Sequence, residues 1–433
     1  MKVCKFGGTS MASAESIRKV ADIINADAER RFVVVSAPGK RDSNDIKITD
    51  SLYASFAMKN AEDSYQLFDA VVNRYLDLVK ELEIDIDIMS TINVYRAKLT
   101  TSDRADSIVA MGEHLSAMIL ASVLKWDFVD ARQLIKFDTK GNFNSEYTND
   151  ICGKVLSKYD HAVIPGFYGQ SPSGRTKVFS RGGSDITGAI VARAMGADIY
   201  ENWTDVSGCF VADPRVVKNP KVIRYMSYSE LRELSYMGAS VLHPDSVFPV
   251  RIAKIPINIR NTFSPEDAGT MIVDKVTEHD RLVTGIAGKK NFTSILVEKD
   301  KMNSEVGFTR RLLSVLEQYD ISFEHLPSGI DTMTVVISDS EIKGRIDDVV
   351  KDIREAVGPD YIEVQDNLAL IATVGHGMSY KPGTAARLFS ALSRYGINIR
   401  MIDQGSSEMN IILAVRNEDF DRTVNAIYEE FIN

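Results

Sequence analysis

The chain has 433 residues, more than one ordinary hydrophobic core organises, so we expect two or three domains. Its 44% apolar and 26% charged residues are typical of a soluble globular protein. A net charge of -9 argues against a general nucleic-acid binder, which needs a basic face, but it permits a local basic pocket for a small anion.

The cysteines and the N-terminus indicate where such a protein works. Cys4, Cys152 and Cys209 are odd in number and widely spaced, which fits neither a disulfide framework nor a zinc site and agrees with a reducing cytoplasm. No apolar stretch is long enough for a signal peptide or approaches the ~20 residues of a membrane span. We therefore expect a cytoplasmic enzyme or sensor, with no membrane or nucleic-acid partner.

The first elements form a β-loop-α-β unit. Residues 1–6 and 31–37 are short, apolar and β-branched, which predicts buried strands. A helical pattern covers 14–29, with Ser13 as its N-cap. This order predicts an α/β domain whose mostly parallel sheet carries helices on its faces.

The pattern then turns helical before strands return. Residues 51–126 are mostly helical, with an interruption near Gly112. We place the first domain at 1–275. Its later elements are expected as strands at 161–169 and 176–180, a helix at 185–195 capped by Ser184 and ended by Gly196, and a strand at 197–203.

The C-terminal third contains an internal repeat. Residues 306–337 align with 382–413 at a constant offset of 76 without a gap, and nine of 32 positions are identical. The shared unit is a glycine, an amphipathic helix, a strand, a turn and a strand, and a second helix follows at 341–357 and 418–430. Chance similarity between two amphipathic helices would rarely keep the glycines, the tyrosines and both strands in register. The repeat predicts two ferredoxin-like βαββαβ modules.

The stretch KFGGTS, residues 5–10, follows the first strand. Its glycine pair lets the backbone approach an anion, and Lys5 supplies a positive charge at the strand end, where α/β sheets place ligands. The alternative is a tight strand-helix turn with an exposed lysine.

A second basic residue with a glycine pair occurs in FSRGGSDITGA, residues 179–189. Arg181 suits a carboxylate ligand. Ser184 and Asp185 lie where a helix is expected to begin, so helix capping explains them as well as a role in ligand binding does. Two such loops together indicate a site that holds two anions side by side, a phosphate donor and an acidic acceptor.

Three other stretches carry weaker signals. WTDVSGCFVADPR, at 203–215, is either a surface turn or a loop that holds adenine and ribose. Glu113 lies in an apolar helix, where a charge is either paired or a ligand contact. The six histidines are scattered, so we expect no metal site built from protein clusters. Gly375-x-Gly377 begins like a dinucleotide loop but lacks the third glycine.

Taken together, these motifs resemble the aspartokinases of the amino-acid kinase family. The resemblance covers essentially the whole chain. The matching motifs occur in the family's order: KFGGTS at 5–10, VVVSAPGK at 33–40, GE at 112–113, SRGGSD at 180–185, WTDVSG at 203–208, ADPR at 212–215 and VLHP at 241–244.

The resemblance implies the fold and the reaction. The fold is the three-layer αβα sandwich of amino-acid kinases, followed by two ACT modules. The implied boundaries are 1–275 for the kinase domain, 276–300 for a linker with the first strand of the second module, 301–366 for the first module and 367–433 for the second. The reaction is phosphorylation of the β-carboxylate of L-aspartate by ATP with Mg²⁺.

The resemblance also implies roles for single residues. Lys5 and Asp185 would be catalytic, with Lys5 on the moving phosphoryl group. The nucleotide would be held by Lys5, Gly7, Gly8, Thr9, Thr204, Asp205, Phe210 and Arg215. Aspartate would be held by Ser36, Thr49, Glu113, Arg181, Gly182, Gly183 and Ser184.

By the same resemblance, the ACT pair would sense an amino acid and join subunits into a homodimer or tetramer. The implied effector residues are Met302, Glu305, Phe308, Ser322, Phe323 and Glu324, together with a neighbouring chain. Glu305 and Glu324 suit a cationic side chain, which favours lysine over threonine, although both are also ordinary solvated acids.

Two positions depart from the family pattern. Ser240 stands where some members carry a lysine, and Phe210 stands where a tyrosine is usual. The alternatives are a kinase of another acidic amino acid and a catalytically silent amino-acid sensor. No dinucleotide-binding domain follows the second module in this sequence, so we do not expect a kinase fused to a dehydrogenase.

Overall fold

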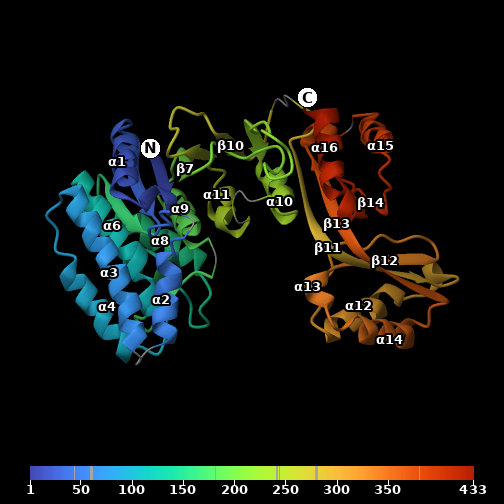
Figure 1. Cartoon of the computed structure of the whole chain (residues 1–433), viewed down its shortest axis with the longest axis horizontal. Coiled ribbons are helices and arrows are strands. Elements are labelled where there is room, and N and C mark those ends of the chain that lie inside the picture. Colours follow the sequence, from blue (N-terminus) through green and yellow to red (C-terminus); the bar gives the residue numbers. More distant parts are fainter. Residues whose placement is uncertain are drawn as a thin grey trace. The chain divides into compact units, whose positions relative to one another are not determined.

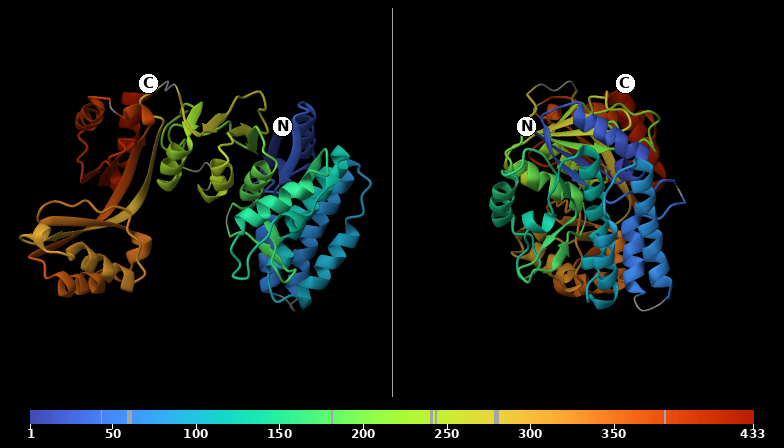
Figure 2. Two further views of the ribbon diagram at one scale, coloured as in Figure 1. Left: turned by 180° about the vertical axis from the view of Figure 1, so that it is seen from behind. Right: turned by 90° about the vertical axis from the view of Figure 1, so that its left-hand side faces the viewer.

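The computed structural model describes residues 1–42, 44–58, 62–180, 182–239, 242, 244–277, 281–379 and 381–433. The chain forms two compact units, shown in Figure 1 and from two further sides in Figure 2. The first unit comprises Met1–Cys209, Val222–Leu231 and Ser240–Thr277. The second comprises Phe210–Lys221, Arg232–Ala239 and Glu278–Asn433, so it includes two short segments that precede the C-terminal third.

The first unit is built on an eight-stranded sheet of order β3-β4-β2-β1-β7-β9-β10-β8. Every neighbouring pair is parallel except β9 with β10, as the sequence predicts for an α/β domain. The strands are β1 (Lys2–Phe6), β2 (Arg30–Val35), β3 (Asp127–Phe128), β4 (Ala162–Pro165), β7 (Ile199–Thr204), β8 (Tyr225–Ser227), β9 (Ile257–Asn261) and β10 (Thr270–Val273).

Side chains of the central strand β7 show how helices cover both faces of this sheet. Tyr200 and Asn202 bond to Asp185 of α9 (Gly183–Ala194), so they point to one face. Trp203 lines a hollow with the opposite helix, α1 (Ala14–Asn25). Because successive side chains of a strand alternate between faces, the arrangement is helix, sheet, helix. The expected three-layer sandwich is confirmed.

The predicted helical stretch is also confirmed. It contains α2 (Ile48–Ala57), α3 (Glu62–Leu82), α4 (Met89–Thr101), α5 (Asp106–Val109) and α6 (Met111–Leu124), with the interruption two residues before Gly112. Residues 106–124 are long and apolar enough to cross a membrane by length and composition, but 72% of the window is buried, as in the core helix of a globular unit. The remaining elements of this region are α7 (Ala131–Leu134), α8 (Ser145–Leu156), β5 (Tyr168–Gln170), β6 (Thr176–Val178), α10 (Tyr228–Tyr236) and α11 (Phe248–Ile252).

The two predicted helix caps have different outcomes. Ser13 caps α1 as expected, because its hydroxyl accepts from the N–H of Ser16, 3.2 Å away, in a capping box. The expectation that Ser184 caps α9 is wrong. The helix starts earlier, after Gly182, which adopts a left-handed backbone (φ 56°) that glycine tolerates without strain. Ser184 lies in the first turn and is buried.

The second unit has a five-stranded sheet of order β12-β11-β13-β15-β14. Two long antiparallel strands, β11 (Gly285–Glu298) and β13 (Tyr361–Val374), run through both modules. The second half of β11 also pairs with β12 (Thr332–Ser338), and the second half of β13 pairs with β15 (Asn410–Arg416). The segment 284–299, expected as the first strand of the second module, contains β11, which pairs with β13 along both of its halves.

The repeat is visible in the helices of this unit. The helices α12 (Phe308–Gln318) and α15 (Thr384–Arg394) differ by the offset of 76 at both ends. Each begins after a glycine in the left-handed region, Gly307 (φ 84°) and Gly383 (φ 86°). The second helices are α14 (Ile346–Val357), preceded by the short α13 (Asp339–Ile342), and α16 (Phe420–Phe431).

The two modules differ at one strand. In the second module the edge strand β14 (Met401–Asp403) pairs with β15. In the first module the corresponding segment makes only isolated bridges, at His325 and Ser328, to β12. Pro327 lies between them and has no N–H to donate, which prevents a regular ladder there. The full βαββαβ pattern is therefore regular in one module only.

The core of the first module yields a stability prediction. Leu312 of α12 is fully buried in this core, whereas Leu313 packs only partly against it. We expect Leu312→Ala to lower the free energy of unfolding of the second unit by about 2–5 kcal/mol because it leaves a cavity. Leu313→Ala should cost clearly less, and urea unfolding followed by circular dichroism measures both. Equal losses from the two variants would contradict the packing described here.

Candidate active site

The carboxyl ends of four parallel strands meet at one edge of the first sheet. Strands β1, β2, β4 and β7 pair in parallel and end at Phe6, Val35, Pro165 and Thr204. The backbone joins these ends, since the N–H of Ser36 donates to the carbonyl of Phe6 across 3.1 Å. The loops that leave this edge carry Gly7, Gly8 and Ser36 among the expected substrate residues, and open α/β sheets bind ligands at such an edge.

An ion pair connects the two glycine-containing motifs. The Nζ of Lys5 lies 2.6 Å from Oδ1 of Asp185, and Lys5 is only 7% exposed. Asn202 of β7 donates to the same carboxylate oxygen across 2.8 Å. A lysine on the first strand and an aspartate 180 residues later are thus held in one fixed geometry at the sheet edge.

The KFGGTS loop is held by backbone contacts that leave two donors available. The N–H of Gly7 donates to the carbonyl of Trp203 (3.0 Å), so it is already used. The N–H groups of Gly8 and Thr9 have no backbone acceptor among the residues that the structure describes. Two adjacent free N–H groups beside a lysine form an anion-binding concavity.

A second loop touches the first, backbone to backbone. The N–H of Gly39 donates to the carbonyl of Gly8 across 2.7 Å. A Cβ on Gly39 would lie 2.7 Å from the carbonyl carbon of Gly8, which is closer than real Cβ atoms approach. Both positions therefore need glycine for the approach of the chains, and not only for flexibility.

The residues before and in α9 surround the other side of the site. Gly183 lies against Phe167, where an added Cβ would be 2.7 Å from the ring, and Gly166 lies against Ser184 in the same way. The N–H of Gly166 donates to the carbonyl of Val35, which ties this corner to the end of β2. Arg181, expected to hold a carboxylate, lies outside the described residues.

Glu113 is a buried carboxyl in the first turn of α6. It is 5% exposed, and burial raises its pKa to about 8 although the N–H of Ala37 and its own N–H donate to it. Its Oε2 atom is buried and has no hydrogen-bond partner in the part of the chain that the structure describes. Ile48 packs near Gly112, so the half-buried Thr49 also lies at this corner. A buried carboxyl with one unpartnered oxygen is suited to a cationic ligand group.

The expected nucleotide residues divide between the units. Thr204 ends β7 in the first unit and Asp205 follows it, and the Thr204 hydroxyl donates to the Asp205 carboxylate across 3.1 Å. Phe210 and Arg215 belong to the second unit. Arg215 is exposed and donates two ways to Asp213, which lowers the pKa of that carboxyl. Ser240 and two residues of the VLHP motif, Val241 and His243, lie outside the described residues.

Sequence reasoning missed several parts of the site. Asn202, which orients Asp185, could have been found as a polar side chain on a buried strand that faces α9. Gly39 and Ala37 carry no side-chain signal for their roles, because those roles use the backbone N–H.

The expected effector residues occupy two environments in the second unit. Met302 and Phe308 are buried in the core of the first module. Glu305 pairs with Lys299 (2.7 Å) and with Arg311, and these charges lower its pKa.

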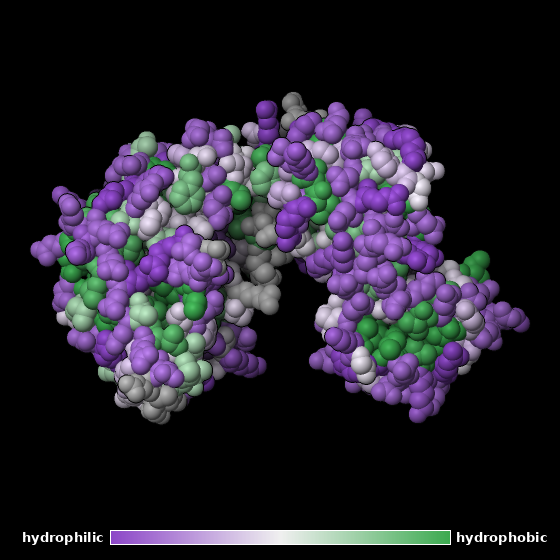
Figure 3. All heavy atoms as spheres, in the orientation of Figure 1, coloured by the Kyte–Doolittle hydropathy of each residue, from purple (hydrophilic) through white to green (hydrophobic). Residues whose placement is uncertain are grey.

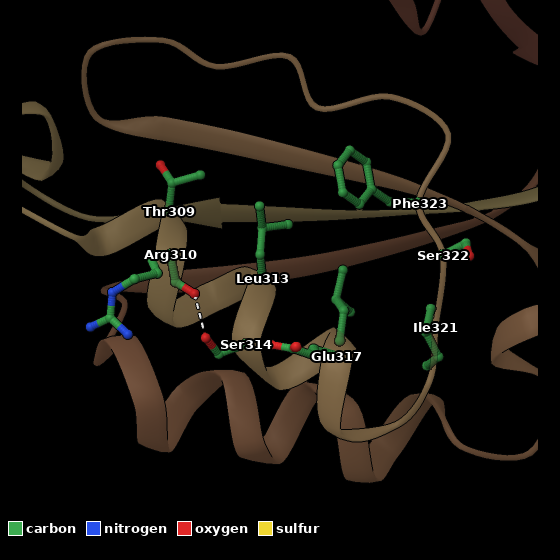
Figure 4. A pocket seen from close by; sticks show the side chains of 9 residues that line it. Thr309, Arg310, Leu313, Ser314, Glu317, Ile321, Ser322 and Phe323 are labelled. Atoms are coloured by element: carbon green, nitrogen blue, oxygen red, sulfur yellow. Dashed lines mark hydrogen bonds between the residues drawn. The ribbon is translucent and has the colours of Figure 1, made fainter.

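Ser322, Phe323 and Glu324 follow α12 at the surface of this module. Glu324 accepts from the hydroxyl of Tyr236. Ser322 and Phe323 line an open hollow of about 840 Å³ beside α12, and Leu313 and Phe323 project into it (Figure 4). Apolar side chains gather on this face of the unit (Figure 3).

Comparison with known proteins agrees with this geometry. The amino acid kinase family model matches residues 1–261, and an ACT domain model matches residues 371–431. The chain is 38% identical to aspartokinase 3 of Bacillus subtilis, over 100% of this chain and 98% of the relative. It is 28% identical to the lysine-sensitive aspartokinase 3 of Escherichia coli, over 98% of both.

Solved structures show the same relationship. The aspartate kinase of Clostridium acetobutylicum has a TM-score of 0.91 and 46% identity over 99% of each chain. Escherichia coli aspartokinase III in complex with aspartate and ADP has a TM-score of 0.77 and 25% identity over 99% of each chain. The chain therefore belongs to the amino acid kinase family, as an aspartokinase with C-terminal ACT domains.

Proposed function

We propose that the chain transfers the γ-phosphoryl group of ATP to the β-carboxylate of L-aspartate, giving 4-phospho-L-aspartate. The observation that carries this proposal is the Lys5–Asp185 ion pair between two glycine-containing loops at the sheet edge. A place at the first step of lysine, threonine and methionine biosynthesis follows from that product. A cytoplasmic location is part of the same proposal.

The chemistry requires positioning and charge stabilisation more than proton transfer. A carboxylate oxygen of aspartate attacks the γ-phosphorus, the bond to the β-γ bridging oxygen breaks, and ADP leaves with that electron pair. The attacking group is already ionised, so no general base is needed. Lys5 and the N–H groups of Gly8 and Thr9 are suited to the charge that develops on the transferred group.

The residues around this centre divide by the charge that they offer. Asp185, oriented by Asn202, holds the Lys5 ammonium toward the phosphates. Glu113 suits the ammonium of aspartate, and Arg181 suits one of its carboxylates. Further contacts to aspartate are assigned to Ser36, Thr49, Gly182, Gly183 and Ser184, and Gly7 completes the phosphate loop.

A magnesium ion fits this donor set. Mg²⁺ in kinase sites is held by one or two carboxylates together with phosphate oxygens. Asp185 is the carboxylate beside the phosphate loop, and the described residues contain no cluster of three or more potential metal ligands. When bound, the ion neutralises charge on the phosphate oxygens. Thr204, Asp205, Phe210 and Arg215 are assigned to the remainder of the nucleotide.

Regulation by an amino acid is assigned to the ACT modules, with lysine as the effector and with ACT domains joining a homodimer or tetramer. One solved structure of the Escherichia coli relative contains lysine and aspartate and is described as the T-state. In this chain Glu305 is already paired with Lys299 and Arg311, and Glu324 with Tyr236. A lysine effector that recruits these two glutamates has to replace those partners. The state with the present pairs and a state in which the pairs are broken would therefore differ in their affinity for lysine. Met302, Phe308, Ser322 and Phe323 are the other effector residues assigned.

The acceptor and the effector are tested in one assay. We expect ADP release that depends on aspartate and not on glutamate, and inhibition when lysine, rather than threonine, is added. Turnover with glutamate alone would identify another acidic amino-acid kinase. Absence of ATP turnover would identify a sensor. A flat response to lysine up to millimolar concentrations would contradict the proposed effector.

Lys5 is tested by substitution. Lys5→Ala should reduce kcat by about 100-fold or more, because the lysine acts on charge that develops during transfer, while the KM for ATP changes much less. Lys19→Ala is a matched control, since Lys19 lies on α1 with an exposed partner, Glu15. Unchanged turnover in Lys5→Ala would refute the catalytic role.

Glu113 predicts a pH dependence of aspartate binding. With a pKa near 8, its carboxyl is mostly protonated at pH 7 and must lose that proton to hold an ammonium group. The KM for aspartate should therefore fall as pH rises from about 6.5 to 8, by up to roughly tenfold per unit. In Glu113→Gln the KM should be higher and lose this slope.

The same raised pKa has an opposite effect on stability. Burial favours the protonated form, so the contribution of Glu113 to folding is fully present below its ordinary value of 4.5 and is lost as pH rises through about 8. Urea unfolding across this range should show a smaller loss of stability in Glu113→Gln than in the unmodified protein. An identical pH profile of KM in both proteins would contradict the role of Glu113.

A further inference from the structure

Arg74 is a buried arginine of α3 that neither the sequence motifs nor the mechanism above employ. It is 8% exposed, and its guanidinium reaches toward the site instead of toward solvent. One of its nitrogens donates to the carbonyl of Gly39 and lies 3.5 Å from the carbonyl of Ala12. The other terminal nitrogen lies 3.2 Å from the carboxylate of Asp45.

These partners are unusual for a buried cation. Taking a guanidinium out of water costs several kcal/mol, which a carboxylate partner in good geometry offsets. Among the described residues Arg74 has one carboxylate partner, Asp45, which is shared with Arg41. Its other contacts are main-chain carbonyls, and its Nε atom is buried without a partner among the described residues. Burial lowers the pKa of Arg74. Maximum stability is therefore a weak explanation for a charge at this place.

The two carbonyls belong to the loops that form the site. Gly39 donates its N–H to the carbonyl of Gly8, and Ala12 directly follows the short 3-10 helix Thr9–Met11. A single guanidinium therefore holds the loop after β2 and the end of the KFGGTS segment at a fixed separation. The loop after β2 also presents Ala37, whose N–H donates to Glu113.

We propose that Arg74 is a positioning residue for phosphoryl transfer. It holds the KFGGTS segment, which is assigned to the ATP phosphates, and the loop after β2, which carries Ser36, at the spacing that the reaction requires. This inference rests on the proposed assignment of Gly8 and Thr9 to ATP and of Ser36 and Glu113 to aspartate. A displacement of about 1 Å between reacting groups can cost on the order of 100-fold in rate. The described partners of Arg74 are Ala12, Gly39 and Asp45, none of which is assigned to ATP or aspartate, so its loss should act through the loops.

The matched control is Arg96 of α4. Arg96 also bonds to α3, through Asp69 at 2.6 Å, and lies over the ring of Phe68 on the same helix. It is half-buried, and its partners among the described residues, Asp69 and Phe68, belong to neither of the two loops. Arg96→Gln therefore removes an arginine contact to α3 without removing a contact to the site.

The test compares steady-state kinetics of folded variants in the full chain. Arg74→Gln should lower kcat by about 10- to 100-fold while the KM for ATP and for aspartate changes by less than about threefold. Arg74→Lys keeps the charge but cannot make the same set of bonds, so it should recover part of the loss. Arg96→Gln should retain the kcat of the unmodified protein.

A double-mutant cycle separates positioning from simple destabilisation. Asp45→Asn removes the anchor of the guanidinium and should lower kcat by a smaller factor. The double variant with Arg74→Gln should be no slower than Arg74→Gln alone, because both act through one contact. Additive losses, or an unchanged kcat in Arg74→Gln, would overturn the inference.

The same measurements distinguish a wrong positioning role for Arg74 from a wrong proposed function. If the unmodified protein shows no aspartate-dependent ADP release, the function is wrong; if it is active and Arg74→Gln is equally active, only the positioning role is wrong. If circular dichroism shows that Arg74→Gln is unfolded, the kcat values of Arg74→Lys and Asp45→Asn are compared with that of the unmodified protein instead. Unchanged kcat in both would then overturn the role.

Discussion

The proposed active site depends on an ion pair between the first strand of the chain and the helix that starts at its second glycine pair. Lys5 and Asp185 meet because β1 and β7 are neighbours in a parallel sheet and α9 packs on the face to which Asn202 points. The pair is largely removed from water, so its geometry is well defined and its charges are little screened. The loops on either side have to fit around it.

Several features of the surrounding chain follow from that constraint. The glycine contact between residues 8 and 39 allows two backbones to lie within hydrogen-bond distance beside the lysine. On the opposite side, Glu113 is kept neutral by burial until a cation replaces the missing solvent. The proposed site therefore combines a charged pair with an uncharged acid, an arrangement that suits a polyanionic donor beside the pair and a zwitterionic acceptor beside the acid.

Much of this organisation could be predicted from the sequence, and the reasons differ between elements. The strands β1 and β2, the helix α1 with its capping serine, and the repeat of α12 and α15 have strong local signals: apolar runs, a capping box and a constant offset. Side-chain motifs with charge, such as Lys5 and Asp185, were also identifiable. The start of α9 was not, because it depends on the left-handed conformation of Gly182 and on the close packing of Gly183 against Phe167, which is a tertiary contact.

What the sequence could not show were roles carried by the backbone or by residues distant along the chain. The contact of Gly39 with Gly8, the donor from Ala37 and the carbonyl partners of Arg74 have no residue-type signature. The irregular edge of the first module depends on Pro327, whose effect is local, but its consequence appears only once β12 is in place.

The long strands β11 and β13 limit which parts of this regulatory unit can be removed, exchanged or substituted independently. Each strand contributes hydrogen bonds to both modules, so neither module forms a complete sheet from strands of its own. Removing or exchanging one module alone would leave unpaired backbone groups on half of each strand. Exposed strand edges of this kind make a protein prone to aggregation. A substitution that bends either strand should therefore disturb the hydrogen bonding of both modules.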